Sequence, residues 1–127
     1  MKYLLDTNAL IGLLFRPDFL SGIAKSILRT SDNLSVSIAS LWEIGIKKSI
    51  GKLELDATAE DLSNMCADLG IRLLPLSPKH IDIMCSLEKI HKDPFDRIII
   101  SQALEEGMIL ITSDTIIPQY KGLKTLW

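Results

Sequence analysis

Long apolar runs are missing from this sequence, and their absence limits the kinds of protein it can encode. No stretch approaches the roughly 20 apolar residues that a membrane-spanning helix needs. The opening MKYLLDTN also lacks the long apolar segment and the small-residue cleavage site of a signal peptide. We therefore expect a cytoplasmic protein that has no membrane partner.

Cysteine is scarce, which argues against several kinds of site. The chain has 2 cysteines, Cys66 and Cys85, and each lies in an apolar stretch with helical spacing. A buried free thiol is the common state of such a residue, and a disulfide or metal ligand is much rarer. We expect neither cysteine to take part in the function.

An excess of positive charge is also absent. The formal net charge is −2, the sequence pI is about 5.6, and no block of like charges occurs. This balance disfavours a broad basic face that grips duplex nucleic acid. A nucleic-acid function would then depend on a few cations beside a metal-filled pocket, because bound divalent ions invert the local field of a group of carboxylates.

The apolar residues that are present predict a parallel sheet. Short unbroken apolar stretches at 3–5 and 108–111 are typical of strands buried on both faces. The segments 34–38 and 123–127 alternate apolar with polar residues, which suits strands nearer an edge. Residues 71–76 are a further candidate, and Pro75 confines that strand to an edge or ends it.

Helical patterns separate these strands. They occupy the segments 19–28, 41–50, 58–70, 77–90 and 93–107. The last three begin at Thr58, Ser77 and Asp93, which are favoured N-cap residues, and the 77–90 helix is expected to carry its apolar side chains through Leu87 and Ile90. Strands that alternate with helices predict the α/β class, here a three-layer α/β/α domain with a central parallel sheet over residues 1–127.

Four acidic residues are placed where such a fold collects functional groups. Asp6 and Asp114 follow the two most apolar strands, and functional side chains of open α/β sheets gather beyond the carboxyl ends of the strands. Asp96 lies in the first turn of the helix that begins after Asp93. Glu43 lies in the apolar segment 41–46, where a charge requires a partner. If the two strands are neighbours, these acids meet in one crevice.

Carboxylates crowded into one crevice predict a metal site. Without a cation they would repel one another, and burial would raise some of their pKa values. Oxygen ligands without a nearby set of Cys or His favour Mg²⁺ or Mn²⁺ over zinc. One ion would activate water and a second would stabilise the leaving oxygen during attack on a phosphodiester, so we expect one or two ions per subunit.

The acidic residues occur in an ordered series of motifs: Asp6-Thr7-Asn8, Glu43, His91 to Arg97, and Thr112-Ser113-Asp114. Along the whole chain this series resembles that of PIN-domain nucleases, and residues 91–102 resemble the VapC-like toxins of type II toxin–antitoxin systems. The resemblance implies a PIN-like fold, cleavage of RNA, a homodimer and a cognate antitoxin that wraps and inhibits the enzyme. It also implies that the catalytic, metal-binding quartet is Asp6, Glu43, Asp96 and Asp114.

Neighbouring polar residues receive secondary roles. We expect Thr7, Asn8 and Ser113 to orient the acids through hydrogen bonds rather than to bind metal. The candidates for contact with the substrate are Arg97, Lys47 and His91, although an arginine of this kind also suits a surface ion pair and a lysine a solvated face. His91 is not required as a base, because metal lowers the pKa of water.

The acids also have ordinary structural interpretations. Asp6 suits the N-cap of a following helix, Glu43 can pair with Lys47 at i+4, and Asp114 can end its strand at a turn. Asp93, directly before a proline, is predicted to be an N-cap.

Three other functions remain open from the sequence. The first is a phosphatase or receiver domain with a phosphorylated aspartate, which would want a second acid where Asn8 stands. The second is a non-catalytic interaction module. The third is an RNA-processing or DNA-cleaving PIN nuclease outside toxin–antitoxin systems.

Overall fold

The computed structural model describes residues 1–127, and its centre is a five-stranded sheet. All neighbouring strands are parallel, and the order across the sheet is β3-β2-β1-β4-β5. The strands are β1 (Tyr3–Leu5), β2 (Leu34–Ser37), β3 (Arg72–Leu74), β4 (Ile109–Ile111) and β5 (Thr125–Leu126). Because the sheet is parallel, the carboxyl ends of all strands meet at one edge.

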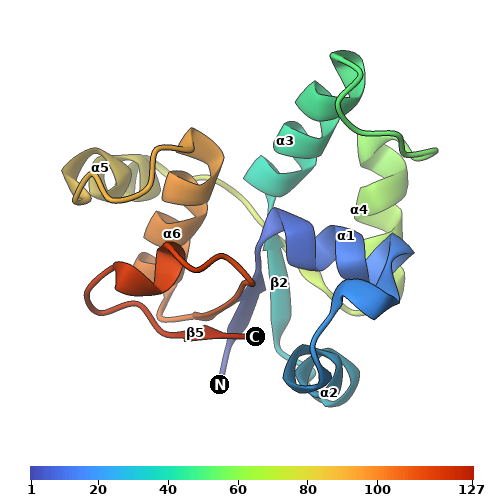
Figure 1. The fold of residues 1–127 in the computed structure, drawn as a ribbon, viewed down its shortest axis with the longest axis horizontal. Coiled ribbons are helices and arrows are strands. Elements are labelled where there is room, and N and C mark those ends of the chain that lie inside the picture. Colours follow the sequence, from blue (N-terminus) through green and yellow to red (C-terminus); the bar gives the residue numbers. More distant parts are fainter.

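Six α-helices and two short 3₁₀ turns connect the strands. The elements are α1 (Thr7–Phe15), η1 (Pro17–Phe19), α2 (Gly22–Thr30), α3 (Ile38–Ser49), α4 (Ala59–Asp68), α5 (Pro78–Ser86), α6 (Pro94–Glu106) and η2 (Ile117–Gln119). Figure 1 shows α5 and α6 on one side of the sheet and α1, α2 and α4 on the other. The predicted three-layer α/β/α class is therefore confirmed. None of these helices is long and apolar enough to cross a bilayer.

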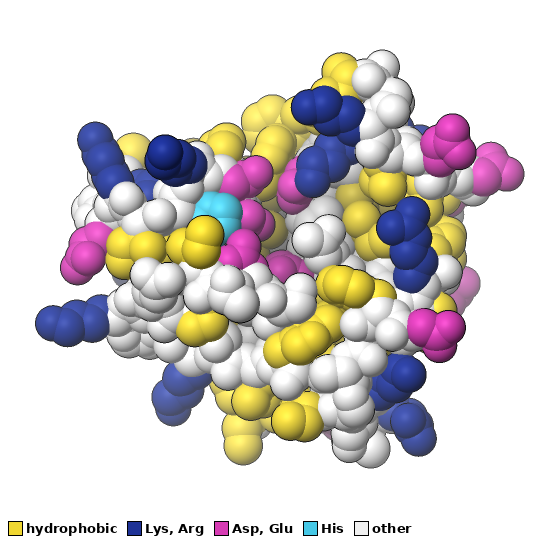
Figure 2. All heavy atoms as spheres, in the orientation of Figure 1, with side chains coloured by type: hydrophobic (Ala, Val, Ile, Leu, Met, Phe, Trp, Pro, Cys, Tyr) yellow, Lys and Arg dark blue, Asp and Glu magenta, His cyan; other side chains and the backbone are white.

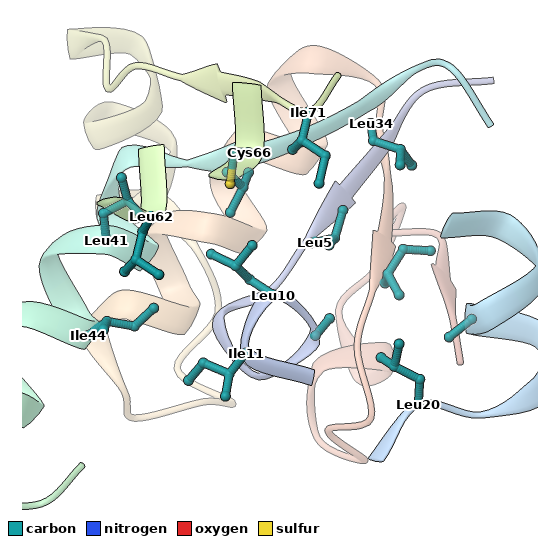
Figure 3. Close-up of a cluster of buried hydrophobic side chains, with 14 of the residues drawn as sticks. Leu5, Leu10, Ile11, Leu20, Leu34, Leu41, Ile44, Leu62, Cys66 and Ile71 are labelled. Carbon is teal, nitrogen blue, oxygen red and sulfur yellow. The ribbon is translucent and has the colours of Figure 1, made fainter. Parts of the chain in front are cut away.

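Alternation along the central strands produces two hydrophobic cores. Leu5 and Ile111 point into the larger core, which they share with α1, α3 and α4, and which Figure 3 shows from close by. Leu4 and Leu110 point to the opposite face and pack in the smaller core with α6. Residues of a strand alternate between its two faces, so strands of three residues are enough to serve both cores.

The register of β1 determines where the acidic residues lie. Leu5 pairs with Val36 of β2 on one side and with Ile111 of β4 on the other. The amide of Asp6 donates to the carbonyl oxygen of Ile111 at 3.1 Å. The two most apolar strands are neighbours, which is the condition that the sequence set for the acids to meet, and Asp6 follows the middle strand of the sheet.

The prediction that residues 34–38 lie nearer an edge is wrong, because β2 is an inner strand that pairs with both β1 and β3. All four of its residues are buried, Ser35 and Ser37 included. The Ser37 side chain is satisfied locally, since its oxygen accepts from the amide of Ala39 at 3.0 Å and caps α3. The two other segments predicted at edges do form β3 and β5, the edge strands.

Most helix boundaries follow their predicted caps. Thr58, Ser77 and Asp93 are the N-caps of α4, α5 and α6. Gly70 and Gly107 follow α4 and α6 with φ of 73° and 64°, a backbone conformation that favours glycine after a helix.

One helix ends earlier than the sequence predicts, a second is displaced along the chain, and a further one lies outside the predicted segments. The helix α5 ends at Ser86, so Leu87 and Ile90 lie beyond it and pack on the smaller core from a loop. Phe19 belongs to η1, and α2 begins only at Gly22. The additional helix is α1, which follows β1 after a single residue, Asp6.

The buried cap of α3 gives a prediction about stability. Ser37→Ala should lower the free energy of unfolding by about 1 kcal/mol, because the amide of Ala39 loses its acceptor where water does not reach it. Urea denaturation measures this difference. Ser26→Ala on the exposed face of α2 is the matched control and should change stability by less than about 0.5 kcal/mol. Equal stability of the two variants would contradict the role of Ser37.

Candidate active site

The four predicted acids approach one another at the carboxyl edge of the sheet. Asp6 follows β1 directly, and Asp114 lies in the loop after β4. Glu43 projects from α3 and Asp96 from the first turn of α6. Figure 2 shows acidic side chains around a histidine near the middle of this face of the molecule. This is the crevice that the positions of Asp6 and Asp114 after their strands predict.

Asp6 both caps a helix and belongs to the group of four acids. Its Oδ1 accepts from the amide of Ala9 at 2.8 Å and so caps α1, which confirms the N-cap interpretation. The residue is only 5% exposed. The pKa of Asp6 is raised to about 6, chiefly by burial and to a smaller extent by the charges of Asp114 and Glu43, while hydrogen bonds act to lower it. The capping carboxylate therefore also belongs to the acidic cluster.

Asp96 is the acid whose ionisation is opposed by the most neighbours. Burial and then the charges of Asp93, Glu43 and Asp6 raise the pKa of Asp96 to about 7, while His91 acts to lower it. Asp96 therefore lies close enough to these three carboxylates for their charges to act on it. The predicted N-cap role of Asp93 is confirmed, since its Oδ1 accepts from the amide of Asp96 at 3.0 Å. Its charge nevertheless contributes to the same acidic field.

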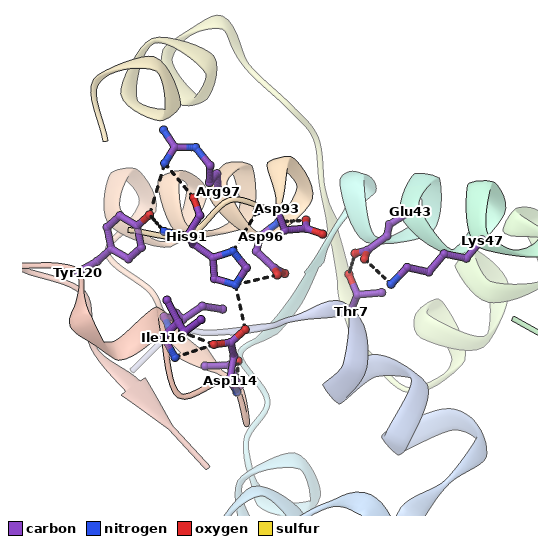
Figure 4. A network of polar contacts seen from close by, with 12 residues as sticks. Thr7, Glu43, Lys47, His91, Asp93, Asp96, Arg97, Asp114, Ile116 and Tyr120 are labelled. Atoms are coloured by element: carbon purple, nitrogen blue, oxygen red, sulfur yellow. Dashed lines mark hydrogen bonds and ion pairs between the residues drawn. The ribbon is translucent and has the colours of Figure 1, made fainter. Parts of the chain in front are cut away.

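Glu43 is buried and has two partners. It is 5% exposed. The hydroxyl of Thr7 donates to Oε1 at 2.6 Å, and the ammonium of Lys47 lies 2.8 Å from Oε2. The pKa of Lys47 is raised chiefly by the hydrogen bond with Glu43, with smaller contributions from the charges of Asp93 and Asp96. Lys47 therefore supplies positive charge to the acidic cluster, as Figure 4 shows.

Asp114 is fixed by the protein at both oxygens. Its Oδ1 accepts from the amides of Ile116 at 2.7 Å and Ile117 at 3.3 Å. Its Oδ2 lies 2.9 Å from Nε2 of His91. Burial acts to raise the pKa of Asp114, but the hydrogen bonds from His91 and the two amides lower it below the ordinary value. Asp114 is the acid that is best prepared to stay ionised.

His91 joins two of the acids. Its Nε2 lies 2.9 Å from Asp114 and 3.2 Å from Oδ2 of Asp96, and all three groups fall within 4.8 Å of one another. Its Nδ1 accepts from the amide of Asp93 at 3.1 Å. A neutral imidazole that accepts at Nδ1 carries its proton on Nε2, so in this arrangement His91 donates to the two carboxylates.

The sequence predicts only a substrate contact for His91, and its hydrogen bonds to the acids are a finding of the structure. One signal was available: His91 lies two residues before the N-cap Asp93, where a ring nitrogen can accept that residue's amide. Of the three residues expected to orient the acids, Thr7 contacts Glu43 directly. Asn8 and Ser113 are exposed, and no hydrogen bond joins their side chains to any of the four acids.

The sequence profile of the PIN domain matches residues 3–123 of this chain. The chain belongs to the PIN-domain family. The resemblance seen in the ordered acidic motifs is thereby confirmed, and the family is one of nucleases. A comparison of the sequence with curated proteins found no significant match.

Solved structures share the complete fold of this PIN domain. VapBC2 from Rickettsia felis, bound to a DNA fragment from its promoter, has a TM-score of 0.70 at 18% identity and covers 99% of this chain and 98% of its own. FitAcB from Neisseria gonorrhoeae has a TM-score of 0.69 at 18% sequence identity, and the match covers 98% of this chain and 96% of that one. VapBC-1 from nontypeable Haemophilus influenzae has a TM-score of 0.67 at 23% sequence identity, and the match covers 99% of this chain and 97% of that one. At these identities the likeness establishes the fold.

Arg97 of the PIN domain points away from the acids. Its guanidinium donates to the carbonyl oxygens of Met84 and Glu88, each at 3.0 Å, and lies 3.4 Å from the hydroxyl of Tyr120. That hydroxyl accepts from the amide of His91 at 2.8 Å. Figure 4 shows Arg97 turned toward Tyr120 and the loop before α6. This geometry favours a role in holding the His91 loop over direct contact with substrate.

The donor set of the PIN domain fits a hard divalent cation. Its oxygens come from carboxylates, and burial with mutual repulsion raises the pKa of both Asp6 and Asp96. Such a pair gains most when a cation neutralises it. Lys47 also lies close to the acids, and it already pairs with Glu43.

The raised pKa values predict how the metal-free protein responds to pH. A carboxyl whose pKa is higher in the folded state binds its proton more tightly there, so it stabilises the fold fully when the pH is below the ordinary pKa of 3.8. This stabilisation is lost as the pH rises to the folded-state pKa, which is about 6 for Asp6 and about 7 for Asp96. In EDTA, stability from these groups should therefore decrease between about pH 4 and pH 7 and level off above that. Asp96→Asn should remove much of this decrease and be at least as stable as the parent at the higher pH.

Urea denaturation at several pH values tests this expectation. Asp82→Asn, which changes an exposed acid on α5, is the control and should keep the dependence of the parent. Asp93→Ala removes the N-cap of α6 and should instead cost about 1 kcal/mol at low pH. An Asp96→Asn variant that loses stability at high pH would contradict the proposed repulsion.

His91 supports a second prediction, based on two matched variants. His91→Asn keeps an acceptor near the position of Nδ1 but has no donor near that of Nε2, whereas His91→Gln keeps a donor there and loses the acceptor. If donation to the acids is what matters, His91→Asn should weaken Mn²⁺ affinity by about 10-fold. His91→Gln should restore most of it. Titration calorimetry measures both affinities, and an unchanged affinity in His91→Asn would contradict the assignment.

Proposed function

We propose that this PIN domain is a metal-dependent endoribonuclease and the toxin of a toxin–antitoxin pair. The observation that carries the proposal is the gathering of four carboxylates at the carboxyl edge of the sheet, among them the buried Asp6 and the half-buried Asp96. Burial, and then the neighbouring carboxylates, raise the pKa of Asp6 to about 6 and that of Asp96 to about 7. Structural ion-pair networks are usually arranged to lower such pKa values, whereas functional sites often raise them.

The four carboxylates would hold Mg²⁺ or Mn²⁺, as one or two ions per subunit. The residues concerned are Asp6, Glu43, Asp96 and Asp114. When bound there, a divalent ion lowers the pKa of coordinated water and stabilises negative charge on a phosphodiester. Asp6 and Asp96 contribute ionised oxygens once the cation offsets their repulsion. Asp114 remains ionised and oriented because His91 and two amides donate to it.

Lys47 is the residue that the geometry favours for the substrate phosphate. Its ammonium pairs with Glu43 at 2.8 Å and is still 42% exposed. A phosphate that approaches the carboxylates would meet this charge first. Thr7 holds Glu43 in place through its hydroxyl. Asn8 and Ser113, whose side chains make no hydrogen bond to the acids, are exposed.

The partners are proposed from the structural neighbours. One of these is described as a toxin–antitoxin complex from Klebsiella pneumoniae, with a TM-score of 0.66 at 20% identity, and others are VapBC assemblies. By analogy we propose a cognate antitoxin and a homodimer for this chain, which acts in the cytoplasm. RNA is the proposed substrate because the chain's modest set of cations suits a few phosphate contacts better than a duplex-binding face.

Cleavage assays with purified protein test this function. Chelation with EDTA should abolish cutting of an RNA substrate, and Mg²⁺ or Mn²⁺ should restore it. Asp96→Asn should reduce the rate by at least about 100-fold, because the site loses a charged ligand, whereas Asp82→Asn should cut like the parent. Parallel single-stranded and duplex DNA substrates show whether the activity belongs to RNA. Full activity in excess EDTA would exclude the metal mechanism, and absence of any cleavage would favour a non-catalytic interaction module.

A further inference from the structure

A pocket of opposite charge adjoins the acidic cluster, because Lys47 lines it and pairs with Glu43. It encloses about 340 Å³ between α1, η1 and the end of α3, which lies at the lower end of the range of roughly 300–1,000 Å³ that is usual for ligand pockets. Three of its lining residues are cations and none is acidic. The residues that carry the argument are Arg16, Lys47, Lys52, Phe19, Asn8 and Ser113.

The pocket lies directly beside the acidic cluster. Lys47 belongs to both sites, because it lines the pocket and pairs with Glu43. Asn8 lies two residues after Asp6, and Ser113 is the residue before Asp114. A chain molecule that places one group among the acids can therefore extend directly into the pocket.

Two of its cations have no partner within the protein. Arg16 and Lys52 are exposed, and neither side chain makes a hydrogen bond or an ion pair. Each follows the end of a helix, α1 or α3, where the helix dipole favours positive charge without a carboxylate. Both charges stay available for an anion from outside, in a protein whose net charge is −2.

An exposed aromatic ring completes the pocket. Phe19 is 44% exposed. Its ring lies 5.1 Å from that of Trp127, tilted by 55°. Gly12 lies beneath it, and a Cβ atom there would come within 3.0 Å of Cδ2 of Phe19. The ring is thus supported on two sides while part of it faces the pocket.

Free cations beside an exposed, supported aromatic ring form the combination that binds single-stranded nucleic acid. The cations attract the backbone, and the ring accepts an unpaired base. A duplex would offer no free base for Phe19 and would need a broader basic face than three cations provide.

We propose that this pocket binds the RNA strand next to the scissile bond. Arg16 and Lys52 contact a flanking phosphate, Phe19 stacks on an unpaired base, and Lys47 lies between this pocket and the acids. The inference rests on the proposed RNA cleavage and adds the requirement that the strand be single where it leaves the site.

Steady-state cleavage of a fluorescently labelled single-stranded RNA tests the cationic part. The double variant Arg16→Gln/Lys52→Gln should raise KM by about 10-fold while kcat changes less than about 2-fold, because these cations bind the strand equally in ground and transition states. The log–log dependence of affinity on salt should become less negative by about 0.7 for each phosphate that the variant no longer neutralises. Lys121→Gln/Lys124→Gln removes the same charge from exposed positions outside the acidic cluster and this pocket and should leave KM unchanged.

The aromatic part is tested with two substitutions of one residue. Phe19→Leu keeps an apolar side chain but removes the stacking surface, and should raise KM by about 5-fold or more. Phe19→Tyr should restore the parental value. Thermal melts of all variants show that each is folded.

The outcomes separate the two proposals. If the parent does not cut RNA, the proposed function fails and this inference with it. If the parent cuts RNA and the pocket variants have its KM, the inference alone is overturned. Unchanged KM together with weaker inhibition by a co-expressed partner protein would assign the pocket to that protein instead.

Discussion

The cost of placing several carboxylates together, partly removed from water, is the constraint on which this structure depends. Asp6 lies at the end of the middle strand and Asp96 at the start of α6, and burial makes the charge of each costly. The fold offsets only part of this cost. Lys47 neutralises Glu43, and His91 donates between Asp96 and Asp114. The remaining negative charge is what suits the site to a cation, and a better neutralised cluster would lose that capacity.

Hydrogen bonds from the protein fix one carboxylate oxygen in three of the acids, and for Asp6 and Asp114 these bonds are local. The amide of Ala9 fixes Oδ1 of Asp6, and two amides after β4 fix Oδ1 of Asp114. The hydroxyl of Thr7 does the same for Oε1 of Glu43. Ordinary capping and turn interactions therefore also orient Asp6 and Asp114, so the structural and functional interpretations of these two residues do not exclude one another.

Features that depend on local chemistry could be predicted from the sequence, and features that depend on packing could not. The N-caps Thr58, Ser77 and Asp93 and the central strands were predicted because neighbouring residues determine them. The inner position of β2 was missed, since alternating serines suggest a solvated face and only the neighbouring strands show that Ser35 is buried. The directions of His91 and Arg97 escaped prediction for a similar reason: the hydroxyl of Tyr120, far along the chain, helps to fix both.

Proton release on metal binding tests the central claim most directly. Titration calorimetry with Mn²⁺ at pH 6.5, in buffers with different enthalpies of ionisation, gives the number of protons displaced. With pKa values of about 6 for Asp6 and about 7 for Asp96, the metal-free site holds part of its protons at this pH and must release them to coordinate a cation. We expect saturable binding with net proton release that disappears by about pH 9, where both acids are already ionised. Saturable binding without proton release, or no binding at all, would contradict a site built on repelling carboxylates.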